Sequence, residues 1–144
     1  MKTTTVGLIL LLFVSACSHK TESNITDIPQ VKAAAQKSAE QWLALVDAGN
    51  YAESWKTAAG YFQTAVRQDQ WDHTISTVRE PLGDLVSRQL KSAQYTKSLP
   101  DAPAGKYVVL QFDTSFANKK EAVETVTPKL DADGTWKVSG YYIK

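Results

Sequence analysis

The chain has 144 residues, enough for one domain with its own hydrophobic core and not comfortably for two. Its 16 basic and 15 acidic side chains give a formal net charge of +1. No basic excess exists to neutralise a phosphate backbone, which argues against nucleic acid as a partner. Cys17 is the single cysteine, so the chain cannot close a disulfide on itself or build a metal site from several thiolates.

The start of the chain has the pattern of an export signal. Met1-Lys2 supplies a basic start, and an apolar run from Val6 to Val14 follows. The run is too short to span a bilayer as a helix, which takes about 20 apolar residues. The segment Val14-Ser15-Ala16-Cys17 resembles the lipobox of bacterial lipoproteins, in which Val is an accepted variant of the commoner Leu.

This resemblance implies that residues 1–16 are cleaved as a signal peptide and that Cys17 receives a diacylglycerol, usually with a further acyl chain such as palmitate. An ordinary leader followed by an incidental cysteine is the less favoured alternative, because Cys17 stands at the processing position. Residues 17–26 then form the lipidated cysteine and a flexible tether that reaches roughly 30 Å. Ser18, where Asp would retain a protein at the inner membrane, indicates the outer membrane in a host that has one. We therefore expect a lipid-anchored domain that contacts the membrane through Cys17 and faces the periplasm.

The first helix is predicted to begin near Asp27, which is placed to cap it, with Pro29 in its first turn and Gly49 at its end. At 100° per residue, one face of this helix collects mostly apolar side chains. These are Val31, Ala35, Ser38, Ala39, Trp42, Leu45 and Val46. Asp47 lies away from this face.

A second helix is predicted to begin after Asn50, where Glu53 gives a pattern close to a capping box, and to end at Gly60. The helical stretch 62–79 carries two apolar sets that do not continue one stripe, so we expect a kink or two short helices. The first set is Phe62 and Val66, and the second is Trp71, Ile75 and Val78.

The remainder of the chain has the pattern of strands. Four strands are expected, and they cover residues 85–97, 107–116, 122–130 and 135–143. Pro128 marks a bulge or an edge, and Asp133-Gly134 closes a tight hairpin. Helices followed by a meander of strands predict an α+β fold, with two to three N-terminal helices packed on one face of a four-stranded antiparallel sheet. We expect residues 27–144 to form this single domain.

Alternation in the strand 107–116 divides its side chains between two faces of the sheet. The apolar set, which should face the helices, is Val108, Leu110, Phe112 and Phe116. Asp113 has the opposite parity and should face solvent, beside a polar neighbour across the hairpin such as Glu121 or Thr125. Tyr107 shares the parity of Asp113, so it should also face outward.

Several motifs in combination resemble a small exported bacterial domain of unknown function, numbered 4019 among such domains. The motifs are Trp42-Leu43-Ala44-Leu45-Val46-Asp47-Ala48-Gly49-Asn50-Tyr51, Ser54-Trp55, Arg79-Glu80-Pro81-Leu82-Gly83, Trp136-Lys137-Val138 and Gly140-Tyr141-Tyr142. The resemblance covers roughly residues 33–144. It implies a compact α+β domain related to the nuclear-transport-factor-2-like or cystatin-like rolls, and it implies no established reaction.

His73 is the first candidate for chemistry, because Asp69 precedes it by one helical turn and an Asp–His dyad is geometrically possible. The apolar set around Trp71 defines the buried face, however, and His73 points away from it. Asp69, Asp72 and Ser76 are also expected to point outward. A solvated polar face is therefore the favoured interpretation.

Arg79 and Arg88 flank the segment Pro81-Leu82-Gly83 and are candidates for an ion pair or for holding an anionic ligand. A structural ion pair with a carboxylate such as Asp84 is the favoured alternative. Aromatic side chains either line a pocket or form the core, and aromatics at helical or strand spacing usually form the core. The pocket candidates are Trp42, Tyr51, Trp55, Trp71, Trp136 and Tyr142.

The sequence contains no nucleotide-binding loop, nucleophile elbow or metal-ligand cluster, so no catalytic residue, metal or cofactor is assigned. We therefore expect an envelope lipoprotein that serves as a non-catalytic binding or accessory module. The alternative is a small-molecule carrier or enzyme that uses a cavity between helices and sheet. Whether the partner is an envelope protein, a glycan or a small molecule stays open at this point.

Overall fold

The computed structural model describes residues 27–144, so the predicted leader, Cys17 and the tether lie outside the described residues. The described helices are α1 (Ile28–Asp47), α2 (Tyr51–Lys56), α3 (Gly60–Ala65) and α4 (Gln68–Arg79), followed by the 3-10 turn η1 (Glu80–Leu82). The described strands are β1 (Leu85–Thr96), β2 (Tyr107–Phe116), β3 (Lys119–Leu130) and β4 (Trp136–Ile143). The strands form one antiparallel sheet in the order β1-β2-β3-β4. The predicted α+β fold, with helices first and a meander after them, is confirmed.

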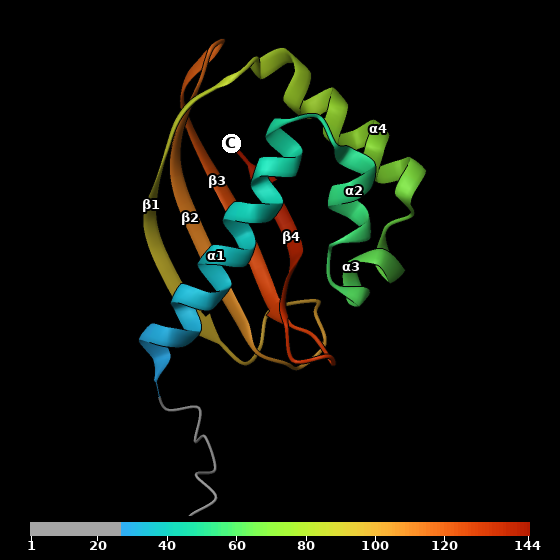
Figure 1. The fold of residues 1–144 in the computed structure, drawn as a ribbon, viewed down its shortest axis with the longest axis vertical. Helices are drawn as coiled ribbons and strands as arrows, with labels where there is room; N and C mark the ends of the chain where they lie inside the picture. Colours follow the sequence, from blue (N-terminus) through green and yellow to red (C-terminus); the bar gives the residue numbers. More distant parts are fainter. Residues whose placement is uncertain (1–26) are drawn as a thin grey trace, which may run out of the picture.

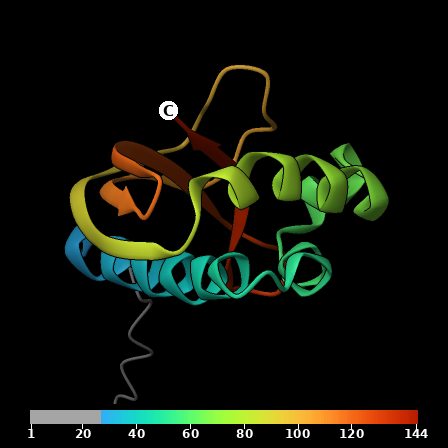
Figure 2. The same ribbon diagram turned by 90° about the horizontal axis from the view of Figure 1, so that it is seen from above.

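Helix α1 lies lengthwise against one face of the sheet, and α2, α3 and α4 lie beside α1 and beyond the β4 edge (Figure 1). We call the face that α1 covers the inner face and the opposite face the outer face. Seen from above in Figure 2, α1 lies on the inner side, and no described helix covers the outer face. The hydrophobic core fills the space between α1, α2, α4 and the inner face.

The ends of α1 and the start of α2 at Tyr51 agree with the prediction, whereas the end of α2 and the start of α3 differ from it. Asp27 accepts a hydrogen bond from the Gln30 amide at 3.4 Å, and Gly49 adopts a positive φ of 73° after the helix. Within the described residues, the Asn50 side chain makes no capping hydrogen bond, so the predicted capping box is wrong. Helix α2 ends at Lys56, and Gly60 begins α3 instead of ending α2.

The connection between α2 and α3 is held by the sheet, which explains why the chain starts a new helix there. The amide of Ala59 donates to the carbonyl of Val138 in β4 at 2.8 Å. The amide of Gly60 donates to Oδ2 of Asp131, just after β3, at 3.1 Å. The first contact joins residues 79 positions apart and the second joins residues 71 positions apart, and helix propensity does not reveal them.

The stretch 62–79 falls into the two short helices α3 and α4, as one of the two predicted alternatives stated. The inward face of α4 is rotated from the predicted one. Val78 is 38% exposed, although it was expected in the core, and Arg79 is 5% exposed in its place. Asp72 and Ser76 are half-buried instead of pointing outward. This position brings Arg79 to two carboxylates, the half-buried Asp47 and the buried Glu124, described below.

Side chains of β2 alternate as predicted along most of the strand, and the apolar set faces the core. Tyr107 is the exception, because it is 1% exposed although its parity points outward. The loop between β1 and β2 covers the Tyr107 side chain, whose hydroxyl donates to the carbonyl of Pro103 at 2.6 Å. The residue opposite Asp113 on β3 is Val123, so the expected polar neighbour is also wrong.

The register of the sheet shifts at several points. Strand β1 contains one extra residue at Val86 and another at Lys91, each without a partner of its own on β2. The pairing of β3 with β4 shifts next to Pro128, at the position where the sequence predicts a bulge or an edge. Each extra residue in β1 changes which positions face inward.

The hairpin between β2 and β3 docks on the segment that follows α4. The amide of Asn118 donates to the carbonyl of Leu82 at 2.9 Å, and the amide of Ala117 donates to the carbonyl of Asp84 at 2.8 Å. Gly83 between them has a φ of 72°, and a Cβ on it would lie 3.1 Å from the Cβ of Ala117. Glycine is required here both for the backbone conformation and for the close approach.

Candidate functional site

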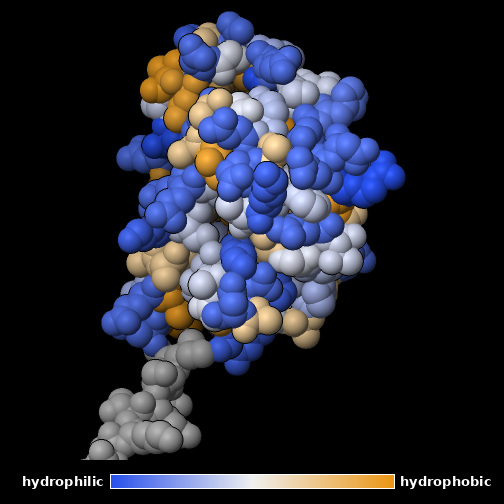
Figure 3. All heavy atoms as spheres, turned by 45° about the vertical axis from the view of Figure 1, so that its right-hand side comes forward, coloured by the Kyte–Doolittle hydropathy of each residue, from blue (hydrophilic) through white to orange (hydrophobic). Residues whose placement is uncertain are grey.

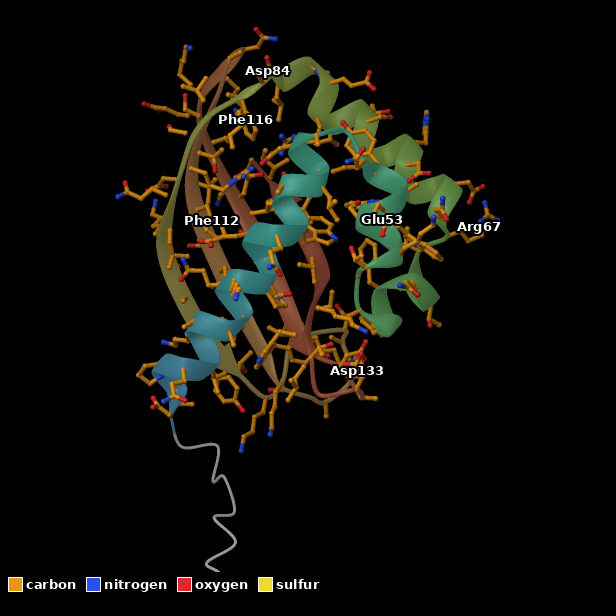
Figure 4. All side chains as sticks on the ribbon, in the orientation of Figure 1. Glu53, Arg67, Asp84, Phe112, Phe116 and Asp133 are labelled. Atoms are coloured by element: carbon orange, nitrogen blue, oxygen red, sulfur yellow. The ribbon has the colours of Figure 1, made fainter. Side chains whose placement is uncertain are left out.

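A cluster of four charged side chains lies on the inner face, where α1 and α4 end. Asp47 is the last residue of α1, Arg79 is the last residue of α4, Arg88 comes from β1 and Glu124 comes from β3. Phe112 and Phe116, labelled in Figure 4, come from β2 and are buried on the same face of the sheet. We call Asp47, Arg79, Arg88 and Glu124 the ion-pair cluster.

Each arginine of the ion-pair cluster bonds both carboxylates. Arg79 donates to Asp47 at 2.7 Å and to Glu124 at 3.2 Å, through its two terminal nitrogens. Arg88 donates to Asp47 at 2.7 Å and to Glu124 at 2.6 Å, through Nη1 and Nε. The charges alternate around a closed ring and sum to zero, which is the arrangement that offsets the cost of burying ions.

Neutral side chains complete the cluster. Glu124 is 0% exposed and also accepts hydrogen bonds from the Tyr141 hydroxyl at 2.6 Å and the Thr114 hydroxyl at 2.7 Å. The guanidinium carbon of Arg79 lies 4.5 Å from the centre of the Phe116 ring, within the range of a cation–π contact. Through these contacts the cluster joins α1, α4 and all the described strands.

The protonation states of the cluster follow from burial and from its partners. Burial acts to raise the pKa of Asp47, but hydrogen bonds and charges from Arg88 and Arg79 outweigh it and hold that pKa below its ordinary value. Burial and the charge of Glu124 raise the pKa of Tyr141 well above that of a free tyrosine. Asp47 therefore stays ionised and Tyr141 stays neutral near pH 7, and in these states both groups keep their hydrogen bonds within the cluster.

Sequence reasoning singled out two members of this cluster and missed the other two. Arg79 and Arg88 come together, but their carboxylate partners are Asp47 and Glu124 instead of Asp84. Asp47 was placed on the solvent side of α1, and Glu124 was not considered. The sequence pattern that could have identified Glu124 is its spacing in β3. It lies two residues from both Ala122 and Val126, so all three share the buried face of the strand.

The histidine candidate lies apart from the ion-pair cluster. His73 is exposed, and Asp69 is bonded to Arg67 by two contacts of 3.2 Å. Both side chains therefore belong to the solvated face of α4, as the sequence predicted. Figure 3 shows that the helical side of the molecule is largely hydrophilic, with small separate hydrophobic patches.

Five of the six candidate pocket aromatics belong to the hydrophobic core or its margin, and the sixth, Tyr142, lies apart from them. Trp42 and Trp71 are buried, with ring centres 5.8 Å apart, and their indole N–H groups donate to the Ser54 carbonyl and hydroxyl. Tyr51, Trp55 and Trp136 are half-buried at the margin of this core. Tyr142 is 62% exposed on the outer face, on the other side of the sheet.

Two hollows on the described residues lie close to residues discussed above. The smaller, of about 250 Å³, lies between α1 and β4 beside Trp42 and Trp136. The larger, of about 810 Å³, is an open depression near one end of the outer face. We call the larger one the outer hollow. Its lining side chains that point outward are Ser87, Gln89, Asp113, Ser115, Glu121, Val123 and Lys144, with Lys120 beside them.

Residues 27–144 contain no helix that is both long and apolar enough to cross a membrane. In the same residues, no three His, Cys, Asp or Glu side chains gather as ligands for a metal ion.

Comparison with known families adds one result. The profile of the family described as "Protein of unknown function (DUF4019)" matches residues 38–141. The chain belongs to this family. The residues that match the DUF4019 profile include the whole ion-pair cluster together with Thr114, Phe116 and Tyr141. No curated protein matches the chain.

Proposed function

We propose that this chain is a non-catalytic binding module of the bacterial envelope, anchored by lipid on Cys17 and engaging its partner with the outer face of the sheet. The observation that carries the proposal is the placement of the outer hollow. The described chain enters α1 at Ile28 at one end of the domain, and the β2–β3 hairpin lies at the opposite end (Figure 1). The outer hollow is lined by residues of β1, β2 and β3 next to the turn of this hairpin, and by Lys144. The 20 residues of α1 separate the two ends by about 30 Å. A domain tethered at Ile28 would therefore hold the outer hollow away from the membrane.

The state of the buried acids supports a binding role in preference to catalysis. Both carboxylates of the ion-pair cluster, Asp47 and Glu124, are bonded by two arginines each. The groups that hold these two carboxylates are side chains of the domain itself, so both acids already serve a structural role. On the outer face, Asp113 is bonded to Lys91 at 3.0 Å in an exposed ion pair. An acid so open to water lacks the enclosure that catalytic carboxylates use to adjust their pKa.

The anchor is tested first, by mass spectrometry of the mature protein and by fractionation of envelopes. We expect a mature chain that begins at Cys17, carries lipid and remains with the membrane fraction. Cys17→Ser should release the protein from that fraction or block its processing. An unmodified Cys17 in a freely soluble protein would overturn the anchored role.

The binding face is tested by site-specific photo-crosslinking in intact cells. A crosslinker at Gln89, which lines the outer hollow, should trap envelope material, whereas one at His73, on the exposed face of α4, should not. Both positions are exposed, so the two variants are matched for stability and access. Equal trapping from both positions, or trapping from His73 alone, would remove the outer face from the proposal.

A further inference from the structure

A row of uncharged polar side chains crosses the outer face beside the outer hollow. Ser92 of β1 pairs with Gln111 of β2, Gln111 pairs with Thr125 of β3, and Thr125 pairs with Tyr142 of β4. We call these four side chains the polar row. Since neighbouring strands lie about 4.8 Å apart, the polar row is about 14 Å long. It ends at Tyr142, whose exposed fraction of 62% is the largest among the described large hydrophobic side chains.

The polar row has the composition of a carbohydrate site. Sugars present hydroxyl groups that both donate and accept hydrogen bonds, and side-chain amides and hydroxyls match them in both roles. Sugars also present flat C–H faces, which pack on an exposed aromatic ring, and Tyr142 offers such a ring. The centre of a stable protein–protein interface is by contrast apolar and rich in aromatics, whereas Tyr142 is the single aromatic of the polar row.

The outer hollow adds charge next to the polar row. Asp113 and Val123 form the next register pair, and Lys144 is bonded to Val123 through two backbone hydrogen bonds of 2.8 and 3.1 Å. Lys120 and Lys144 carry positive charge at the rim, and Asp113 and Glu121 carry negative charge. A ligand that combines uncharged sugars with both carboxylates and amines would fit this pair of features. An open depression also suits a polymer that runs across it.

We propose that the polar row and the outer hollow bind the glycan strands of the bacterial cell wall, which are polymers of N-acetylated amino sugars that bear short peptides. The sugars stack on Tyr142 and bond Gln111 and Thr125, while Lys120 and Lys144 meet peptide carboxylates. This inference rests on the proposed envelope location and binding face, and it names the ligand class of that same face. With the tether at the other end of α1, the domain would bridge its membrane to the wall.

The test is co-sedimentation of the detergent-solubilised full-length mature protein with purified cell-wall sacculi. We expect the protein to sediment with the sacculi and to remain in solution once the glycan has been digested. Tyr142→Ala should weaken the binding about three- to tenfold, as expected for loss of one aromatic packing contact, and Tyr142→Phe should retain most of it. Gln111→Ala should weaken it by a similar factor through lost hydrogen bonds.

The matched control is Tyr61→Ala, which removes an exposed tyrosine from the helical side and should bind as the unaltered protein does. Thermal unfolding of every variant shows that the fold is retained. Absence of sedimentation, or equal binding by Tyr142→Ala and the unaltered protein, would overturn the glycan assignment. If Gln89 crosslinks to a protein in cells while sacculi bind nothing, the binding face stands and the glycan assignment fails.

Discussion

Adjacent residues of one strand differ sharply in exposure because they point to opposite faces of the sheet. On β3, Glu124 faces inward and is 0% exposed, while adjacent Val123 faces outward and is half-exposed. On β2, Phe112 is buried and adjacent Asp113 is exposed. Polarity therefore does not decide which side chain is buried in this domain. At these two pairs strand parity decides it, and the buried charge of Glu124 is stable because the inner face supplies opposite charges and hydrogen bonds.

The strongest test of this contrast removes the carboxylate at the centre of the inner face. Glu124→Ala leaves Arg79 and Arg88 buried with one carboxylate between them, and we expect a loss of about 3–5 kcal/mol in the free energy of unfolding. Urea denaturation followed by tryptophan fluorescence measures this loss. A change below about 1 kcal/mol would mean that water enters the cluster and satisfies the arginines.

Phe112→Ala tests the apolar part of the same face. The ring is 2% exposed in the core between sheet and helices, so its removal costs both burial and a cavity. We expect a loss of about 3–5 kcal/mol, measured by thermal or denaturant unfolding. A small effect would indicate that the inner and outer faces of β2 have been exchanged.

Tyr141→Phe removes one hydroxyl and keeps the ring. That hydroxyl donates to Glu124 and accepts from Arg79 at 3.2 Å, so both charged groups lose a partner. Hydrogen bonds to charged groups are the stronger kind, and we expect a loss of about 1.5–3 kcal/mol in urea unfolding. The variant also separates the contribution of the hydroxyl from that of ring packing against Trp42. No measurable loss would show that the hydroxyl contributes nothing to the cluster.

The pH dependence of stability should report Asp47. Its pKa in the folded protein lies below the ordinary value of 3.8, so the unfolded chain binds a proton first as pH falls. The resulting stabilisation is fully present above the unfolded value and is lost as pH drops from about 4 through the folded value. We expect the unaltered protein to lose stability more steeply in this range than Asp47→Asn. Parallel acid unfolding curves for the two proteins would contradict the assignment.

The smallest effect is expected on the outer face. Asp113→Ala removes an exposed carboxylate and its ion pair with Lys91, and we expect a change below about 0.5 kcal/mol in denaturant unfolding. Compared with Phe112→Ala, it measures the difference between two adjacent residues of one strand. A severe loss would show that the outer face is covered in the folded protein.

Much of the fold could be predicted because the signals that specify it are local. The strict alternation of β2 located Phe112 on the inner face, and the pattern of helices before strands predicted the α+β class. Strand β1 showed no clear alternation, and its bulges explain why. Leu90 faces inward before the extra residue Lys91, and Ala93 faces inward after it, so a period of two cannot hold across the strand.

The candidate site was less predictable because its geometry depends on distant contacts. Arg79 and Glu124 are 45 residues apart, and α4 rotates to bring them together, which leaves Val78 exposed. The apolar residues of α4 alone predict that Val78 is buried and Arg79 is not. Tyr107 was missed for a similar reason, since its cover comes from the loop near Pro103 and not from its parity.

The extra residues in β1 also bear on how copies of this domain behave when they are crowded together. In the described sheet β1 is an edge strand of 12 residues, whereas the other edge, β4, is partly capped by the Ala59 amide. A straight edge of that length would offer unpaired backbone groups to a strand of another molecule. The extra residues Val86 and Lys91 interrupt the row of unpaired backbone groups along β1, and the charge of Lys91 further disfavours pairing with another strand. The bulges therefore make this edge a poor template for pairing with a strand of another copy of the domain.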